Sequence, residues 1–361
     1  MSWTVRVLIG VAVLIAVAFV AFNMFRVQLV ERAYLAAVDR QTAIDPLSEL
    51  EDGLHVYVCG SGSPMASPSR AGPCVGVLAG DQAFIFDAGA GGIRKLMAMQ
   101  FPVAKLEGAY LTHLHSDHID GLGELMLQAW IAGTRAEPLP ISGPIGTEKV
   151  VTAFTSAYEI DKGYRIAHHG TVVANPDGFG GAPKEIFLPL GPSVAEVVYE
   201  SADVKITAIR VEHAPVEPAF GYRIDYKDRS ISLSGDTIYH PGFVAASQGV
   251  DVMLHEALDP EMVQQLGSGL KSAGRETVSK VMFDILDYHA TPEDAARAAA
   301  NAGAQELIYY HIVPPLPMRA LNAIWLGDSA DEFDGKMTVG EDGMMISLPA
   351  GERTIQHSRA F

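Results

Sequence analysis

The stretch LTHLHSDHIDGLGE holds three histidines and one aspartate within the six positions from His113 to His118. On an extended strand alternate side chains share a face, so His113 and His115 would project together. Asp117 and His118 follow where the chain turns into the helical pattern IDGLGELMLQAW. Neutral imidazoles and a carboxylate that are buried together need polar partners. The segment therefore predicts a metal site rather than a packed core.

Three further ligand groups stand at the ends of expected strands. His213 ends KITAIRVEH, Asp236 ends SISLSGD and His311 ends ELIYYH, so each would lie at the mouth of a sheet. Imidazole and carboxylate ligands suit zinc, and also manganese or iron. The sequence thus predicts a site for a pair of divalent ions, with these candidate ligands: His113, His115, Asp117, His118, His213, Asp236 and His311.

The elements that must position these groups are short strands. From residue 54 onward, runs such as LHVYVCG, CVGVLAG and AFIFDAG alternate with Gly/Pro turns and amphipathic helices. This pattern predicts an α/β sandwich of sheets with helices outside. We expect one domain over 54–350 and a C-terminal tail over 351–361.

The N-terminal segment carries no charge from Val7 to Phe25. A helix of that length spans roughly the 30 Å hydrocarbon core of a bilayer. Residues 1–27 are therefore predicted to be a membrane anchor and 28–53 a membrane-proximal linker. A cleaved signal peptide is the alternative, because AVA at 16–18 resembles a cleavage site. The catalytic domain would be periplasmic or otherwise extracytoplasmic, and secreted if the segment is removed.

Composition restricts the partners. The chain has 361 residues and a formal net charge of −17, and an acidic surface repels nucleic-acid phosphates. Nucleic acid is thus not an expected partner, whereas a membrane and a second copy in a homodimer are. Cys59 and Cys74 are either a free buried pair or, outside the cytoplasm, a disulfide.

The motif THLHSDHIDG resembles the H-x-H-x-D-H signature of the metallo-β-lactamase superfamily. Asp87 in FIFDAGAG, His213, the SGDT around Asp236, and His311 follow in that family's order. The resemblance implies an αββα sandwich with two Zn²⁺ ions, or manganese or iron, at one edge. It also implies that Asp87 orients the histidine segment and that Asp236 bridges the metals. The implied ligands are His113, His115 and His213 for one metal, and Asp117, His118 and His311 for the other.

Two further segments resemble the ribonuclease Z branch of that superfamily. They are CGSGSPMASPSRAGPC and the pair LHEAL and HATPEDAARAA. By this resemblance Glu256 orients His289, and His289 protonates the leaving oxygen. The second segment also predicts a helix, since Thr291 suits the N-cap, Asp294 the capping box and Gly303 the C-terminal stop.

The tRNA-processing members of this branch carry a long arm between the positions matching His213 and Asp236, and here the connection is short. The resemblance therefore implies a dinuclear zinc hydrolase of small anionic esters, phosphodiesters or aryl sulfates. It would use a metal-bridging hydroxide, with Asp117, His289 and Glu256 as catalytic residues. The alternatives are a lactonase or thioester hydrolase of this fold and, in another class, a membrane-anchored, non-catalytic metal-binding protein.

The segment 121–212 is expected to shape the substrate pocket. Within it, DKGYRIAHHG offers Tyr164, Arg165 and His169 as candidate substrate contacts, and Arg165 could bind an anionic ester through its bidentate fork. The alternative is an ordinary surface helix end, with His168 and His169 solvated.

Overall fold

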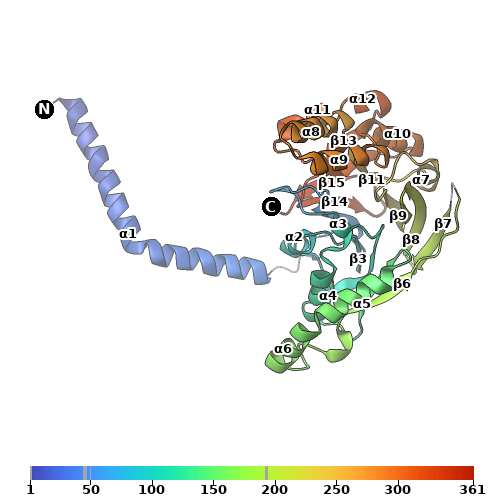
Figure 1. Ribbon diagram of the computed structural model, residues 1–361. Helices are drawn as coiled ribbons and strands as arrows, with labels where there is room; N and C mark the ends of the chain where they lie inside the picture. The colour runs from blue at the N-terminus through green and yellow to red at the C-terminus, as the bar shows by residue number, and fades with distance from the viewer. Residues whose placement is uncertain (1, 44–46, 49, 192–193) are drawn as a thin grey trace. The chain divides into compact units, whose positions relative to one another are not determined.

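The computed structural model describes residues 2–43, 47–48, 50–191 and 194–361. The chain divides into two compact units, Met1–Leu50 and Glu51–Phe361. Figure 1 shows the second unit, in which strands and helices alternate along the chain.

The first unit is dominated by one helix, α1, over Trp3–Ala43. It covers the expected anchor and continues into the expected linker. Its apolar side chains are exposed, including Leu8 and Phe19, each at 68%. The stretch Trp3–Asp39 has a mean hydropathy of up to 2.8 and is long and apolar enough to cross a membrane. A signal sequence meets the same description, so both interpretations of this helix stand.

The second unit is built on two mixed sheets. The eight-stranded sheet has the order β15-β14-β1-β2-β3-β4-β5-β6, and the seven-stranded sheet has the order β13-β12-β11-β10-β9-β8-β7. The first sheet comprises β1 (Gly53–Gly60), β2 (Cys74–Ala79), β3 (Gln82–Phe86), β4 (Leu106–Tyr110), β5 (Leu139–Gly143), β6 (Gly181–Glu185), β14 (Met344–Pro349) and β15 (Gln356–Arg359). The second comprises β7 (Ala195–Glu200), β8 (Val204–His213), β9 (Val216–Tyr226), β10 (Arg229–Leu233), β11 (Val252–Leu258), β12 (Glu306–Val313) and β13 (Lys336–Val339).

Helices cover the outer faces of the sheets. On the first sheet α2 packs against β1 and α5 against β6, and on the second α10 packs against β11 and β12. The helices of this unit are α2 (Gly92–Ala98), α3 (Ser116–Ile119), α4 (Leu122–Ile131), α5 (Thr147–Ala157), α6 (Glu159–His169), α7 (Pro241–Ala246), α8 (Pro260–Ser272), α9 (Glu276–Asp284), α10 (Pro292–Ala302), α11 (Asn322–Trp325) and α12 (Ser329–Glu332). The αββα sandwich implied by the sequence is confirmed.

Apolar side chains from the inner faces of both sheets form the main core. Val56, Val77 and Phe84 from the first sheet and Ile206 and Ile224 from the second are fully buried in one cluster. Side chains alternate between the faces of a strand, so the inner face fills this core while the other face meets the helices. The strand ends remain free to carry polar groups.

Helix α10 has the ends that its sequence predicts. The Thr291 hydroxyl accepts a hydrogen bond from the Asp294 amide, and the Asp294 carboxylate accepts one from the Thr291 amide. Gly303 ends the helix in the left-handed region with φ 63°. Both caps are confirmed, and they hold the segment just before Thr291 in place.

The segment expected as a C-terminal tail adds a strand. β15 pairs with β14 in antiparallel register, with Met344 opposite Arg359 and Ser347 opposite Gln356. The chain between His213 and Asp236 is occupied by β9, a turn and β10, so the structure shows a hairpin and confirms that this connection is short.

Candidate metal centre

The segment that follows β4 carries the first four candidate ligands. His113 and His115 lie on extended chain, and Asp117 and His118 lie on the short helix α3. His113 and His118 are fully buried. The chain passes from this loop into α3, and this change of direction places the four side chains in the same region.

The first cluster joins three imidazoles from distant parts of the chain. Nε2 of His113 lies 2.9 Å from Nδ1 of His115, and Nε2 of His213 lies 3.5 Å from that same nitrogen. The ligand atoms of these histidines and of Asp236 all lie within 4.8 Å of one another. This is a spacing at which one ion can contact all four groups.

The second cluster lies beside the first. Oδ2 of Asp117 is 3.5 Å from Nε2 of His118 and 3.3 Å from Nε2 of His311. Oδ2 of Asp236 lies 3.4 Å from Nε2 of His118 and 3.3 Å from Nε2 of His311. Asp236 therefore faces both clusters, which is the position of a bridging carboxylate.

Groups outside the clusters set the orientation of the imidazoles. Oδ2 of Asp87 lies 2.8 Å from Nδ1 of His118, and the same carboxylate accepts hydrogen bonds from the amide and hydroxyl of Thr112 at 2.8 Å. Nδ1 of His213 faces the carbonyl of Tyr288 at 3.0 Å. Each contact leaves Nε2 directed into the cluster, the arrangement that histidine ligands need. Asp87 orients the segment as expected.

The buried polar atoms of the site fit metal ions. Nε2 of His118 and Oδ1 of Asp236 are buried without a hydrogen-bond partner. An unpaired buried polar atom costs about 1–3 kcal/mol, and these two lie in the clusters described above. Coordination to a cation would satisfy them, and the imidazole and carboxylate donors suit zinc.

The pKa shifts in the site favour bound cations. Burial lowers the pKa of His113 well below its ordinary value and also lowers the pKa values of His115 and His213. These imidazoles are therefore neutral near pH 7 and can donate lone pairs. Burial alone would raise the pKa of Asp236, but the nearby imidazoles, His311 first, hold it well below its ordinary range. The three imidazoles of the first cluster are thus neutral beside an ionised carboxylate. In the second cluster burial alone would lower the pKa of His118, but the carboxylates, Asp236 first, raise it well above its ordinary value.

Two local backbone features place the ligands from the second sheet. β10 ends at Leu233, earlier than expected, and Gly235 turns the chain with φ 60°. A Cβ on Gly235 would lie 2.5 Å from the Phe220 carbonyl oxygen, so glycine is required there. β12 does not end at His311 as expected but continues to Val313.

His311 lies at a bulge within β12. The register with β11 pairs Tyr310 with Glu256 and then Ile312 with Ala257, which leaves His311 as the extra residue. Its φ is 48°, in the left-handed region that costs energy for a residue with a Cβ. A bulge of this kind re-aims a side chain, and here it directs the imidazole of His311 toward Asp117 and Asp236.

His289 and Glu256 lie next to the metal clusters. Oε1 of Glu256 is 2.9 Å from Nδ1 of His289, and the same oxygen accepts hydrogen bonds from the amides of Thr237 at 3.1 Å and Ala290 at 3.2 Å. Glu256 is fully buried. The structure thus brings together the pair that the resemblance implied, and it leaves Nε2 of His289 on the side of Asp236 and His311.

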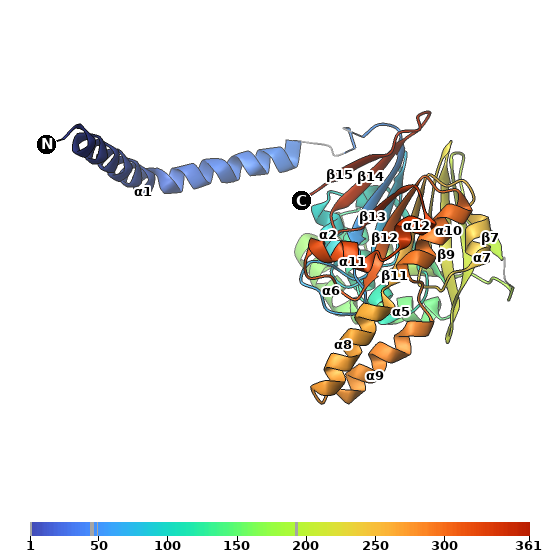
Figure 2. The ribbon, with the colours of Figure 1, turned by 90° about the horizontal axis from the view of Figure 1, so that it is seen from above.

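A cavity of about 220 Å³ opens over the clusters. His115, Asp117, Asp236, His289 and His311 form its polar side. Its apolar side was not foreseen from the sequence and is lined by Met65, Val281, Ile285 and Val313. Val281 belongs to α9, which forms a hairpin with α8 that extends from the unit in Figure 2.

The expectation that 121–212 shapes this cavity is wrong, because none of the described residues in that range lines it. Tyr164, Arg165 and His169 lie on α6, a helix without a buried residue. Nε of Arg165 instead pairs with Asp161 at 2.6 Å. An amphipathic surface helix and a substrate-binding helix have the same local pattern, so only the packing could separate them.

Comparison with known proteins places the chain in a family. The model of the beta-lactamase superfamily domain matches residues 82–312. The chain is 33% identical over 299 residues to ribonuclease Z of Mycobacterium avium (strain 104), covering 82% of this chain and 99% of that protein. It is 35% identical over 292 residues to ribonuclease Z of Mycobacterium bovis (strain BCG / Pasteur 1173P2), covering 80% of this chain and 96% of that protein.

Solved structures share the fold. The metallo-beta-lactamase fold protein YhfI from Bacillus subtilis aligns with a TM-score of 0.57 at 19% identity, covering 82% of this chain and all of that one. The short form of human tRNase Z also aligns with a TM-score of 0.57, at 21% identity, covering 82% of this chain and 99% of that one. The motifs, the fold and the relatives agree, and the chain belongs to the metallo-β-lactamase superfamily, in its ribonuclease Z-like branch of metal-dependent hydrolases.

Proposed function

We propose that this chain is a dinuclear zinc hydrolase of small anionic esters, phosphodiesters foremost and aryl sulfates as the second class. The observation that carries the proposal is the contact of His289 with Glu256 beside the paired ligand clusters. A scaffold that only bound metal would need no proton donor at this place. His113, His115 and His213 would hold one ion, Asp117, His118 and His311 the other, and Asp236 would bridge both.

Two divalent ions, when bound, lower the pKa of water and polarise the ester oxygen. The protein groups then decide where the substrate lies and where the proton goes. The P–O or S–O bond to the leaving group breaks as water adds, and the departing oxygen takes its proton from Nε2 of His289. Glu256 fixes the ring through Nδ1 and stabilises the charged form of the imidazole.

The electrostatics of His289 suit a proton donor. Burial alone would lower the pKa of His289, but the charge and hydrogen bond of Glu256 outweigh burial and raise it. Two metal cations nearby would lower the pKa of His289 again. The contact with Glu256 is therefore needed to keep the imidazole protonated. The Glu256 contact thus favours the protonated form of the His289 imidazole.

The cavity favours a small substrate with an apolar leaving group. Its walls combine the ligand side chains with Met65, Val281 and Ile285, and no lysine or arginine of the described chain lines it. Recognition of a nucleic-acid backbone relies on such cations at the phosphates. A short aryl or alkyl ester needs only the metal ions for its charge and the apolar wall for its leaving group.

The disulfide supports a location outside the cytoplasm. Cys59 in β1 and Cys74 in β2 are bonded to each other, and such bonds persist in oxidising compartments. With the long apolar helix α1, this supports a membrane-anchored extracytoplasmic enzyme, or a secreted one if the helix is cleaved. Cytoplasmic tRNA would not reach the site there. The homodimer stays a prediction.

The relatives favour a second candidate, a tRNA-processing ribonuclease. The short connection between His213 and Asp236 does not distinguish this chain from these relatives. The alignment of 299 residues already spans 99% of the Mycobacterium avium protein. That relative therefore has no long arm that this chain lacks. The argument against tRNA rests on the cavity, the disulfide and the net charge of −17.

The purified chain is expected to hydrolyse bis(4-nitrophenyl) phosphate and to leave precursor tRNA intact at physiological salt. The physical reason is that no lysine or arginine of the described residues lines the cavity over the metal ligands. The assay compares this diester with 4-nitrophenyl sulfate, an aryl lactone and a radiolabelled precursor tRNA. Efficient cleavage of the tRNA near its acceptor end would overturn the small-ester proposal, and faster turnover of the lactone would assign the enzyme to the lactonases.

Metal content provides a separate prediction. Because Asp236 belongs to the first cluster and also faces His118 and His311 of the second, the chain should retain about two divalent ions after purification. Elemental analysis after growth with added zinc measures this directly, and growth with manganese or iron tests the other metals. Fewer than one ion per chain under every condition would contradict the dinuclear site.

A further inference from the structure

A second cavity, of about 390 Å³, lies apart from the metal ligands. Three arginines line it, Arg70, Arg319 and Arg359. In a chain with a net charge of −17, this is a local concentration of positive charge that nothing in the metal centre requires. None of the seven candidate metal ligands lines this cavity.

The carboxylates of the cavity do not neutralise these arginines fully. Nη2 of Arg319 lies 2.6 Å from Oε2 of Glu341, and Arg359 pairs with that same oxygen. No other carboxylate of the described chain pairs with either arginine. The guanidinium groups of Arg319 and Arg359 thus share one side-chain carboxylate, that of Glu341. The side chains of Arg319 and Arg359 are 73% and 44% exposed, so a ligand can reach them.

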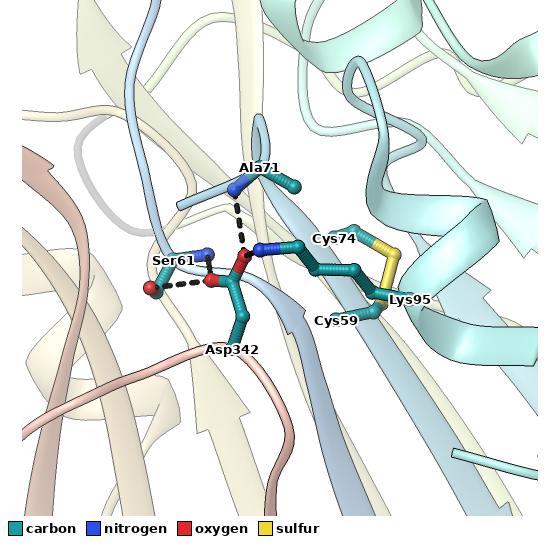
Figure 3. The surroundings of a disulfide bond; sticks show 6 residues. All are labelled: Cys59, Ser61, Ala71, Cys74, Lys95 and Asp342. Carbon is teal, nitrogen blue, oxygen red and sulfur yellow. Dashed lines mark hydrogen bonds and ion pairs between the residues drawn. A yellow bond between two sulfur atoms is a disulfide. The ribbon is translucent and has the colours of Figure 1, made fainter. Parts of the chain in front are cut away.

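The second acidic group, Asp342, is occupied by the protein itself. Its carboxylate accepts hydrogen bonds from the Ser61 amide at 2.8 Å, the Ser61 hydroxyl at 2.7 Å and the Ala71 amide at 2.6 Å, and it pairs with Lys95. Figure 3 shows this carboxylate between the three partners, beside the disulfide. Asp342 therefore cannot neutralise Arg319 or Arg359 as well.

The wall that carries Arg70 is held in place before any ligand arrives. Nη1 of Arg70 donates to the Ser61 hydroxyl at 2.6 Å and to the Gly340 carbonyl. Asp342 binds both ends of the segment from Ser61 to Ala71. A preformed cationic cavity binds with a smaller entropic cost than a flexible one.

Most of the remaining lining is apolar. Leu316, Pro317, Met318 and Phe361 form this part, and Ser69 and Asn322 complete the cavity. Met318 and Phe361 are 60% and 58% exposed. Guanidinium groups bind carboxylate, phosphate and sulfate oxygens by paired hydrogen bonds. The combination selects a ligand with an anionic head and an apolar body.

We propose that this cavity is a binding site for a small amphiphilic anion, a carboxylate, phosphate or sulfonate on an aryl or short alkyl group, held by Arg319 and Arg359. No residue lines both this cavity and the metal cavity, but two chain segments pass from one to the other: Met65 and Val313 line the metal cavity, and Ser69 and Leu316 line this one. Met65 and Ser69 are four positions apart and Val313 and Leu316 are three apart, so the Cα atoms within each pair lie no more than about 14 Å from each other.

The test uses benzenesulfonate, an aryl anion that coordinates metal ions poorly, and neutral benzamide of similar shape. Both are titrated calorimetrically into the metal-loaded full chain in nonionic detergent. We expect saturable one-to-one binding of benzenesulfonate and much weaker binding of benzamide. The double variant Arg319→Gln/Arg359→Gln should weaken benzenesulfonate at least tenfold, and Arg319→Lys/Arg359→Lys should retain part of the affinity.

Matched variants exclude general charge effects and binding in the metal cavity. Arg94→Gln removes an exposed arginine that pairs with Glu124 outside the lining of this cavity, and it should leave the affinity unchanged. Asp236→Ala, with folding checked by circular dichroism, should also keep the affinity for benzenesulfonate. The proposal is overturned if the wild type does not bind, if benzamide binds equally, if the double glutamine variant binds normally, or if folded Asp236→Ala loses binding.

Discussion

Replacing Asp236 with alanine is expected to remove metal and activity together. Its Oδ2 faces His113, His118, His213 and His311 at 3.3–3.9 Å, so its loss removes one ligand from both clusters at once. Metal content should fall from about two ions per chain to fewer than one, and turnover of the best ester should fall by more than about 10³-fold. Elemental analysis and steady-state kinetics on the same sample measure both.

A matched variant distinguishes ligand loss from general damage. Asp251 is also buried, and it accepts hydrogen bonds from the Ser230 amide at 2.8 Å and from the Gln305 side chain at 2.7 Å. Asp251→Asn should lower thermal stability yet keep the metal. An Asp236→Ala protein that retained its ions and its activity would show that Asp236 is not a ligand.

The second large effect is expected at His289. If this imidazole protonates the leaving oxygen, His289→Ala should lower kcat by about 10²–10⁴-fold, the usual span for general acid catalysis. Metal content should stay unchanged, because Nδ1 of His289 faces Glu256 and the variant keeps Asp236 and the six other proposed ligands. His289 also lies within 4.8 Å of Asp236 and His311 by its ligand atoms, so elemental analysis of the variant tests this point directly. A good leaving group departs without a proton, so the loss should be large for a phenyl or alkyl phosphodiester and small for the matching nitrophenyl ester.

Two comparisons make this prediction specific. Glu256→Gln should show a weaker form of the same dependence on the leaving group, since it loses the charge that supports the imidazole. His240 is buried as well but caps α7 by accepting a hydrogen bond from the Phe243 amide, so His240→Asn should show no such dependence. An equal loss on both esters, or the loss of one metal, would assign His289 to substrate positioning or to support of the site.

The sequence alone determined the chemical types and the local geometry of much of this site. His113, His115, Asp117 and His118 stand within six positions, on the loop after β4 and on α3, so their proximity follows from short-range geometry. The caps of α10 follow from Thr291 and its near neighbours for the same reason. Capping and strand alternation depend on residues a few positions apart, which a single sequence displays directly.

The tertiary structure alone decided which distant groups meet. The bulge that aims His311 depends on its register with β11, and the apolar wall at Val281 depends on where the α8 and α9 hairpin packs. The pairing of Cys59 with Cys74 required β1 and β2 to be adjacent. Arg165, a plausible substrate contact by its pattern, lies on an exposed helix instead. Register and packing arise from contacts between residues far apart in the chain, and no local pattern in one sequence encodes them.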